Sequence, residues 1–265
     1  MNVSIFDPTG NITALVSSPV APEAQSAAAR EILRLRPEVE QVGFFTESDT
    51  GLSLRTAGGE FCGNAAMSAA ALALLRRGVP AGETGVSLRV SGASAPVEVR
   101  LRPAGEADFQ AAVKMPPARE IRETALRFGT LRGTLPVVWM QGISHILIEP
   151  DSVFWPLLAD RRAAEQAVND WCAELDADGL GLMFLDSAAR RLTPLVYVPG
   201  SGTCFWENAC ASGTSAVGMA LSARTGGPVD RVFREPGGTL RVTSEAGPGE
   251  TWIYGRTRRI EQWTD

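Results

Sequence analysis

Two of the four cysteines, Cys62 and Cys210, stand in matching surroundings. Each follows a glutamate, Glu60 or Glu207, by two or three positions and precedes small, amide or hydroxyl residues at the start of an alanine-rich stretch. The dipole and unpaired N–H groups of a helix start favour the thiolate, so we expect both thiols to be acidified. Two such thiols facing one carbon atom could remove a proton from one side and return one to the other.

The α-hydrogen of an amino acid is only weakly acidic, and a thiolate is a modest base. The enolate-like carboxylate that forms therefore needs stabilisation, which backbone N–H groups at a helix start provide. The residues after each cysteine fit this role: Gly63, Asn64, Ala211 and Ser212. The pattern predicts an amino acid racemase or epimerase that works without a cofactor.

Other polar residues are weaker candidates. His145, the one histidine of the chain, could exchange a proton with a cysteine or orient it. Glu207 could assist Cys210 or merely hydrogen-bond the helix start. Asn11 follows Gly10 in a tight turn, where it is also a natural turn residue.

Gln41 precedes an apolar strand and could point toward a substrate, whereas Glu40 favours a surface position. Glu60 could be an acidic neighbour of Cys62, but a hydrogen bond to the helix start is favoured. Cys172 and Cys204 are interpreted as core residues, because lone cysteines are usually buried.

Composition excludes several classes of protein. The 265 residues are 45% hydrophobic and 21% charged, with a net charge of −5, which suits neither nucleic acid nor anionic membranes as partners. No long apolar run or signal peptide is present, so we expect a cytoplasmic protein. Four dispersed cysteines and one histidine predict neither a disulfide framework nor a metal site.

The chain reads as two halves with the same order of elements. In the first, strands at 3–6, 12–16, 41–45 and 52–55 accompany helices at 22–36 and 62–77, before a hairpin over 86–102 that turns at 91–94. In the second, strands at 135–140, 145–148, 181–185 and 194–198 accompany helices at 159–175 and 210–224. A hairpin then turns at 236–238. This repetition predicts two similar lobes.

The cysteine-led helices are apolar nearly all round and should lie in the centre of each lobe. Pro116 and Pro117 interrupt regular structure between the halves. We therefore expect an N-terminal lobe of residues 1–116 with Cys62 and a C-terminal lobe of residues 117–254 with Cys210. Residues 255–265 are expected to pack back on the first lobe.

At these residues the chain resembles the diaminopimelate epimerase family of racemases that need no pyridoxal phosphate. The matching pieces are Gly10-Asn11, Cys62-Gly63-Asn64, His145 and Ala209-Cys210-x-Ser-Gly. The resemblance implies an α/β (α+β) fold of two pseudo-symmetric lobes, each a β-rich barrel around a central helix. It also implies two facing cysteines as acid and base, no cofactor, a homodimer, and a site lined by Asn11, Gln41 and His145.

Two departures argue against diaminopimelate as the substrate. Gly179 and Val198-Pro199-Gly200 stand where diaminopimelate epimerases carry an Asn and a Glu-Arg-Gly that bind the distal end of that substrate. Glu207 then becomes a candidate replacement for the missing acid. Strings such as Glu40-Gln41-Val42-Gly43-Phe44 and Trp206-Glu207-Asn208 are similar to the histidine racemase branch of staphylopine-type (opine) metallophore biosynthesis.

The leading hypothesis is a two-cysteine amino acid racemase that interconverts L- and D-histidine. Alternatives are a diaminopimelate epimerase, a racemase of another amino acid, or an isomerase on the same fold that does not use the cysteines. Two further alternatives are an inactive small-molecule binding protein and a thiol redox switch.

Overall fold

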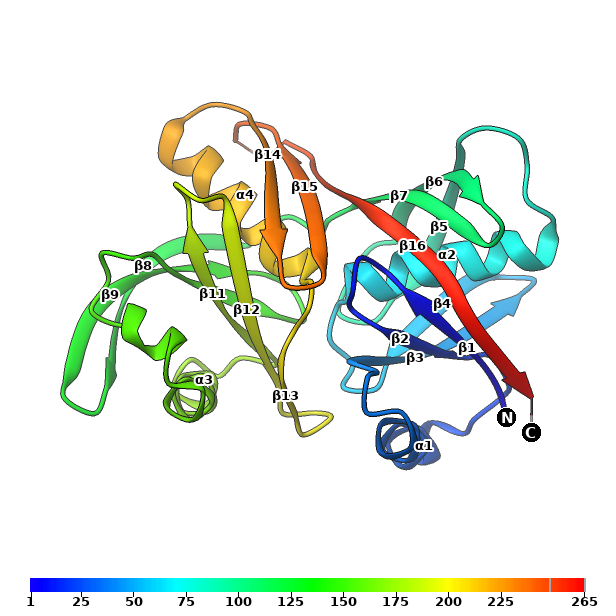
Figure 1. Ribbon diagram of the computed structural model, residues 1–265, viewed down its shortest axis with the longest axis horizontal. Coiled ribbons are helices and arrows are strands. Elements are labelled where there is room, and N and C mark those ends of the chain that lie inside the picture. Colours follow the sequence, from blue (N-terminus) through cyan, green and yellow to red (C-terminus); the bar gives the residue numbers. More distant parts are fainter. Residues whose placement is uncertain (248, 265) are drawn as a thin grey trace.

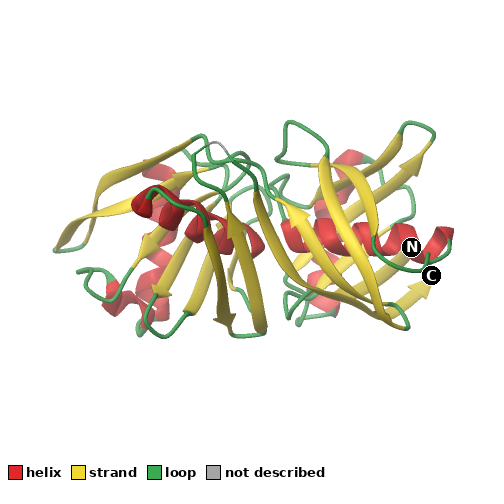
Figure 2. Ribbon diagram, turned by 90° about the horizontal axis from the view of Figure 1, so that it is seen from above, coloured by secondary structure: helices red, strands yellow, loops and turns green. Residues whose placement is uncertain are grey.

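The structure, a computed structural model, describes residues 1–247 and 249–264 and consists of two lobes side by side (Figures 1 and 2). Pro248 and Asp265 lie outside the described residues, so the last residue of the expected C-terminal segment 255–265 is not among them. The two termini lie close together in Figure 1, and Asn2 pairs with Thr264.

The first lobe is a closed barrel. Strands β1 to β7 follow one another around it, the C-terminal strand β16 pairs with β7, and β16 also pairs with β1 to close the ring. Its elements are β1 (Asn2–Asp7), β2 (Thr13–Val16), α1 (Pro22–Leu35), β3 (Gln41–Ser48), β4 (Gly51–Thr56), α2 (Gly63–Arg77), β5 (Thr84–Val90), β6 (Val97–Gly105), β7 (Asp108–Lys114) and β16 (Thr251–Thr264).

The second lobe is a strongly curved sheet in the order β16-β15-β14-β12-β11-β10-β9-β8, with β13 paired to β12. Its elements are β8 (Glu120–Phe128), β9 (Leu131–Trp139), β10 (Ser144–Ile148), the 3-10 turn η1 (Trp155–Leu158), α3 (Arg161–Glu174), β11 (Leu180–Asp186), β12 (Arg191–Val198), β13 (Thr203–Trp206), α4 (Ala211–Thr225), β14 (Val229–Glu235) and β15 (Gly238–Ser244). Residues 115–118, between β7 and β8, belong to no helix or strand, and we propose the lobe boundary there.

Both lobes contain the same pair of crossover units. The parallel strands β2 and β3 are joined through α1, and β4 and β5 through α2. In the second lobe β10 and β11 are joined through α3, and β12 and β14 through α4. The cysteine-led helices α2 and α4 therefore occupy equivalent positions in the two lobes. Each cysteine precedes the central helix of its own lobe.

The two central helices are buried because their side chains are small. Every residue of α2 from Gly63 to Leu74 is buried, and six of these twelve are alanines. In α4, a Cβ on Gly218 would lie 2.5 Å from Cγ2 of Val242 in β15, so glycine lets this helix lie directly against the sheet. Both helices belong to one continuous hydrophobic core.

The predicted fold class is confirmed, and the predicted helices and hairpins are found within a few residues of their expected bounds. Sequence analysis missed β7, β8, β13 and β16. Most residues of β8 are exposed, so this edge strand lacks the alternation of buried and exposed side chains that reveals a strand.

None of the helices within residues 1–247 and 249–264 is both long and apolar enough to cross a membrane.

A close approach of backbone between the lobes, at Gly10 and Gly237, generates a prediction. Gly10 has a φ of 97°, and a Cβ there would lie 2.6 Å from Cα of Gly237. Gly78 has the same φ but open space around it. We expect Gly78→Ala to lower the free energy of unfolding by about 1–3 kcal/mol through backbone strain. Gly10→Ala should cost a further ~1–3 kcal/mol, because it also forces the loops apart.

Chemical denaturation of both variants measures the difference. Equal destabilisation would show that the Gly10–Gly237 contact does not constrain the lobes.

Candidate active site

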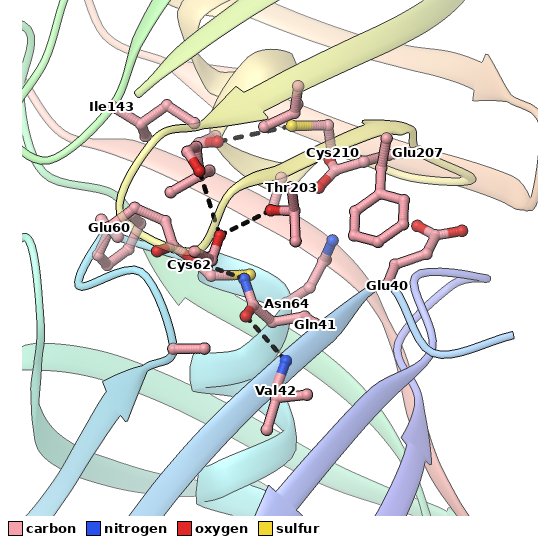
Figure 3. A pocket seen from close by; sticks show the side chains of 18 of the residues that line it. Glu40, Gln41, Val42, Glu60, Cys62, Asn64, Ile143, Thr203, Glu207 and Cys210 are labelled. Atoms are coloured by element: carbon pink, nitrogen blue, oxygen red, sulfur yellow. Dashed lines mark hydrogen bonds between the residues drawn. The ribbon is translucent and has the colours of Figure 1, made fainter. Parts of the chain in front are cut away.

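Each cysteine is the N-cap of its central helix. The Sγ of Cys62 accepts a hydrogen bond from the N–H of Ala65, and the Sγ of Cys210 accepts one from the N–H of Gly213, both at 3.4 Å. The two helix starts meet, since a Cβ on Gly63 would lie 3.0 Å from the Cβ of Ala211. The two caps therefore face one shared cavity from opposite lobes (Figure 3).

The cavity is small, and polar groups form much of its lining. It is lined by Glu40, Gln41, Glu60 and both cysteines with their following residues, and by an apolar wall from the second lobe (Ile143, Val196, Val198 and Phe205). Its volume is about 30 Å³, which is room for a single water. An amino acid is larger than this space, so the groups that line the cavity must move to admit one.

The helix starts offer N–H donors to an anion. The first N–H groups of a helix have no intrahelical partner, and these belong here to Gly63 and Asn64 in α2 and to Ala211 and Ser212 in α4. The Nδ2 of the Asn64 side chain donates to the carbonyl of Ala209 in the other lobe at 2.9 Å, whereas its buried Oδ1 has no partner among the described residues. The backbone of both helices is thus arranged to hold a carboxylate.

Glu40 joins the lobes beside the cavity. Its carboxylate accepts hydrogen bonds from the Asn11 amide at 2.9 Å and from the backbone N–H and side chain of Asn208. The interpretation of Glu40 as a surface residue is wrong, because both its oxygens are used in these contacts. Asn11 is buried, does not line the cavity, and instead supports Glu40.

Two further glutamates flank Cys210. Burial, together with the neighbouring carboxylates of Glu40 and Glu235, raises the pKa of Glu207 to about 8. Glu235 accepts hydrogen bonds from the backbone N–H of Cys210 at 2.7 Å and from the Thr214 hydroxyl, and burial raises its pKa to about 8 as well. Burial also raises the pKa of Glu40, to about 7.

The expectation of acidified thiols is wrong for this closed site. Burial and then the nearby Glu207 raise the pKa of Cys62 to about 12, and the same causes raise the pKa of Cys210 well above its usual value. The hydrogen bond from the Ala65 N–H acts in the predicted direction but is outweighed. A cation brought in among the glutamates would lower both thiol pKa values.

His145 is not brought into the cavity. It is fully buried in β10, its ring nitrogens have no hydrogen-bond partner among the described residues, and burial lowers its pKa to about 3. The Met183 side chain lies next to both the His145 ring and the Cys210 sulfur. Gly181 packs against His145 and Met183, and Gly213 packs against Met183 and Cys210. A neutral core histidine is what the structure shows.

The remaining cysteines differ. Cys172 is buried and donates to the carbonyl of Ala177 at 3.2 Å, as a core residue should. Cys204 is exposed on β13, so its interpretation as a core residue is wrong.

Glu235 was not among the residues predicted from the sequence. It lies two residues after the buried Phe233 and therefore on the inward face of β14. This alternation of buried and exposed residues was the available signal.

The raised carboxyl pKa values predict that stability falls as pH rises. In the folded chain Glu40, Glu207 and Glu235 titrate near 7 or 8 instead of the usual 4.5. Between these limits these three carboxyls bind more protons in the native state than in the unfolded state, so their contribution to the free energy of unfolding is greatest below pH ~4.5 and decreases toward pH ~8. Each carboxyl contributes at most about 1.4 kcal/mol per pH unit.

Glu235→Gln mimics the protonated form, so its amide can accept from Cys210 and donate to Thr214. Urea denaturation from pH 5 to 8 should give a flatter pH dependence for this variant than for the wild type. Glu120→Gln, at an exposed position of β8, is the control and should leave the slope unchanged. Parallel curves for Glu235→Gln and the wild type would contradict the assignment.

Known proteins resemble the whole chain. A family model described as "Histidine racemase CntK N-terminal domain" matches residues 2–252. A histidine racemase of Staphylococcus aureus is 29% identical over 250 residues, which cover 91% of this chain and 88% of that protein. One of Fusobacterium nucleatum is 31% identical over 222 residues, which cover 82% of this chain and 79% of that protein.

The fold is shared more widely. The crystal structure of a probable proline racemase from Agrobacterium radiobacter K84 matches with a TM-score of 0.70 over 100% of this chain and 92% of that one, at 14% identity. The resemblance to racemases that need no pyridoxal phosphate is therefore confirmed. The chain belongs to the histidine racemase family described by the matching model and is an isomerase, a racemase of an amino acid.

Proposed function

We propose that this protein interconverts L- and D-histidine by a two-thiol mechanism without a cofactor. The observation that carries the proposal is the meeting of two cysteine-capped helix starts at one closed cavity. The caps come from equivalent positions in two similar lobes, which suits a reaction whose substrate and product are mirror images.

In this mechanism the substrate carboxylate binds the N–H groups at the starts of α2 and α4. One cysteine, as the thiolate, takes the α-hydrogen and becomes a thiol, while the electron pair of the Cα–H bond moves toward the carboxylate. The other cysteine, initially a thiol, gives its proton to the opposite face of Cα and becomes the thiolate. The two sulfurs exchange roles when the opposite enantiomer binds.

The glutamates of the site support a basic amino acid as substrate. Glu40, Glu60 and Glu207 line the cavity, and no lysine or arginine is among the described residues that line it. The α-ammonium and a protonatable ring would offset this negative charge and lower the thiol pKa values. A distal carboxylate, as in diaminopimelate, would have no cationic partner here, so diaminopimelate is disfavoured.

Further support for histidine comes from the relatives, which carry the name histidine racemase. We extend the proposal to a homodimer in the cytoplasm that supplies D-histidine to an opine-type metallophore, on the strength of the sequence resemblance to that branch. An inactive binding protein is less well supported, because both thiols and the N–H groups of both helix starts are in place.

The two-thiol mechanism predicts the fate of solvent hydrogen. In heavy water, D-histidine formed from L-histidine should carry deuterium at Cα from the first turnovers, while the remaining L-histidine keeps protium. The reason is that a different, solvent-exchanged thiol supplies the new hydrogen. Proton NMR of the α signal combined with chiral chromatography measures both. Deuterium in unreacted L-histidine as early as in the product would point to a single base.

Removal of either thiol should abolish racemisation. We expect Cys62→Ala and Cys210→Ala to lower kcat/KM by at least ~10³-fold, since each loses one proton-transfer group. Cys172→Ala and Cys204→Ala, outside the cavity, are the controls and should stay near the wild-type rate. A Cys62→Ala enzyme that racemises histidine at the wild-type rate would exclude the mechanism, and a panel of other L-amino acids tests the substrate.

A further inference from the structure

Glu60 presents one carboxylate oxygen that has no partner. Its Oε2 is buried and makes no hydrogen bond among the described residues, whereas its Oε1 accepts from Nε2 of Gln41 at 2.7 Å. The residue is 5% exposed and lines the cavity. A buried carboxylate oxygen without a donor is costly, so the site is built for a donor that the protein itself does not supply.

The side chain is held firmly in place. Gln41 is fixed in turn, because its Oε1 accepts the N–H of Val42 at 2.9 Å. The backbone carbonyl of Glu60 accepts from the hydroxyls of Thr56 at 2.7 Å and Ser91 at 3.1 Å. Because both the backbone of Glu60 and one of its carboxylate oxygens are held by hydrogen bonds, the second oxygen has a defined direction. Groups that determine specificity need such a fixed position.

The surroundings of the free oxygen suit the edge of a ring. A Cβ on Gly58 would lie 2.5 Å from both Oε2 of Glu60 and Cγ1 of Val198, and 3.2 Å from the Ser201 hydroxyl. The free oxygen thus lies where the first lobe meets the apolar wall of the second, which can pack against ring faces. Figure 3 shows Glu60 and Glu207 on opposite sides of the two cysteines.

The two glutamates can therefore meet different parts of one substrate. Glu207 lines the same cavity as Cys210, and in the proposed function it faces the α-ammonium group. We propose that Glu60 determines specificity for the side chain: its Oε2 accepts the N–H of the imidazole ring. This inference rests on the proposed function and adds the residue that selects the substrate.

The test compares two ligands of equal shape. L-histidine and 3-(2-thienyl)-L-alanine both carry a five-membered ring, but the thiophene has no N–H. Calorimetric binding and α-deuterium exchange are measured for the wild type, for Glu60→Gln, and for Glu106→Gln at an exposed turn as the control. Because Gln41 donates to the Oε1 position, the glutamine amide places its NH₂ group where the free oxygen was.

We expect the wild type to prefer histidine at least ~100-fold in kcat/KM, because a site built for an N–H rejects an analogue that lacks it. Glu60→Gln should weaken histidine binding and turnover by ~10–100-fold, and thienylalanine by less than ~3-fold. Glu106→Gln should change neither ligand.

Equal losses for both ligands in Glu60→Gln, or equal binding of both by the wild type, would overturn the inference. The wild-type comparison decides the question even if the variant does not fold. Failure of the proposed function looks different: the wild type would then bind histidine without exchanging its α-hydrogen, and the binding comparison would still measure the role of Glu60.

Discussion

The contact between the starts of α2 and α4 is the constraint on which the site depends. Each thiol is a helix cap, so its position is set by its helix, and each helix is set by the sheet that surrounds it. Gly63 and Ala211 let the two helix starts meet, because even a Cβ at position 63 would lie only 3.0 Å from the Cβ of Ala211, which is tighter than ordinary contact. Gly213 in the same way makes room for Met183 beside Cys210. The spacing of the two thiols is therefore a result of core packing.

A cluster of buried carboxyl groups is the second organising feature of the site. Four glutamates (Glu40, Glu60, Glu207 and Glu235) line or flank one small cavity, and three of them titrate far above their usual range. Such a cluster opposes thiolate formation until a cation arrives. In the proposed mechanism, binding of a positively charged substrate would therefore activate the thiols and limit thiolate chemistry to the time when the site is occupied.

The local parts of this arrangement could be predicted from the sequence. The glycines and alanines around Cys62 and Cys210, and the position of each cysteine at a helix start, can be recognised in short sequence motifs. The repeated order of elements indicates two lobes. What could not be predicted depends on contacts between distant segments. Glu235 reaches Cys210 from another strand, Glu40 meets Asn208 across the lobe boundary, and Met183 separates His145 from the cavity. Spacing along the chain contains no signal for any of these.

The strand β16 has a consequence for synthesis of the chain. It follows both lobes in the sequence, yet it pairs with both β1 and β7 and completes the first barrel. Until β16 has been made, the N-terminal half has two unpaired sheet edges and an incompletely covered central helix, a state prone to misassembly. The lobe whose synthesis begins first is therefore closed only after the strands of the second lobe have been made.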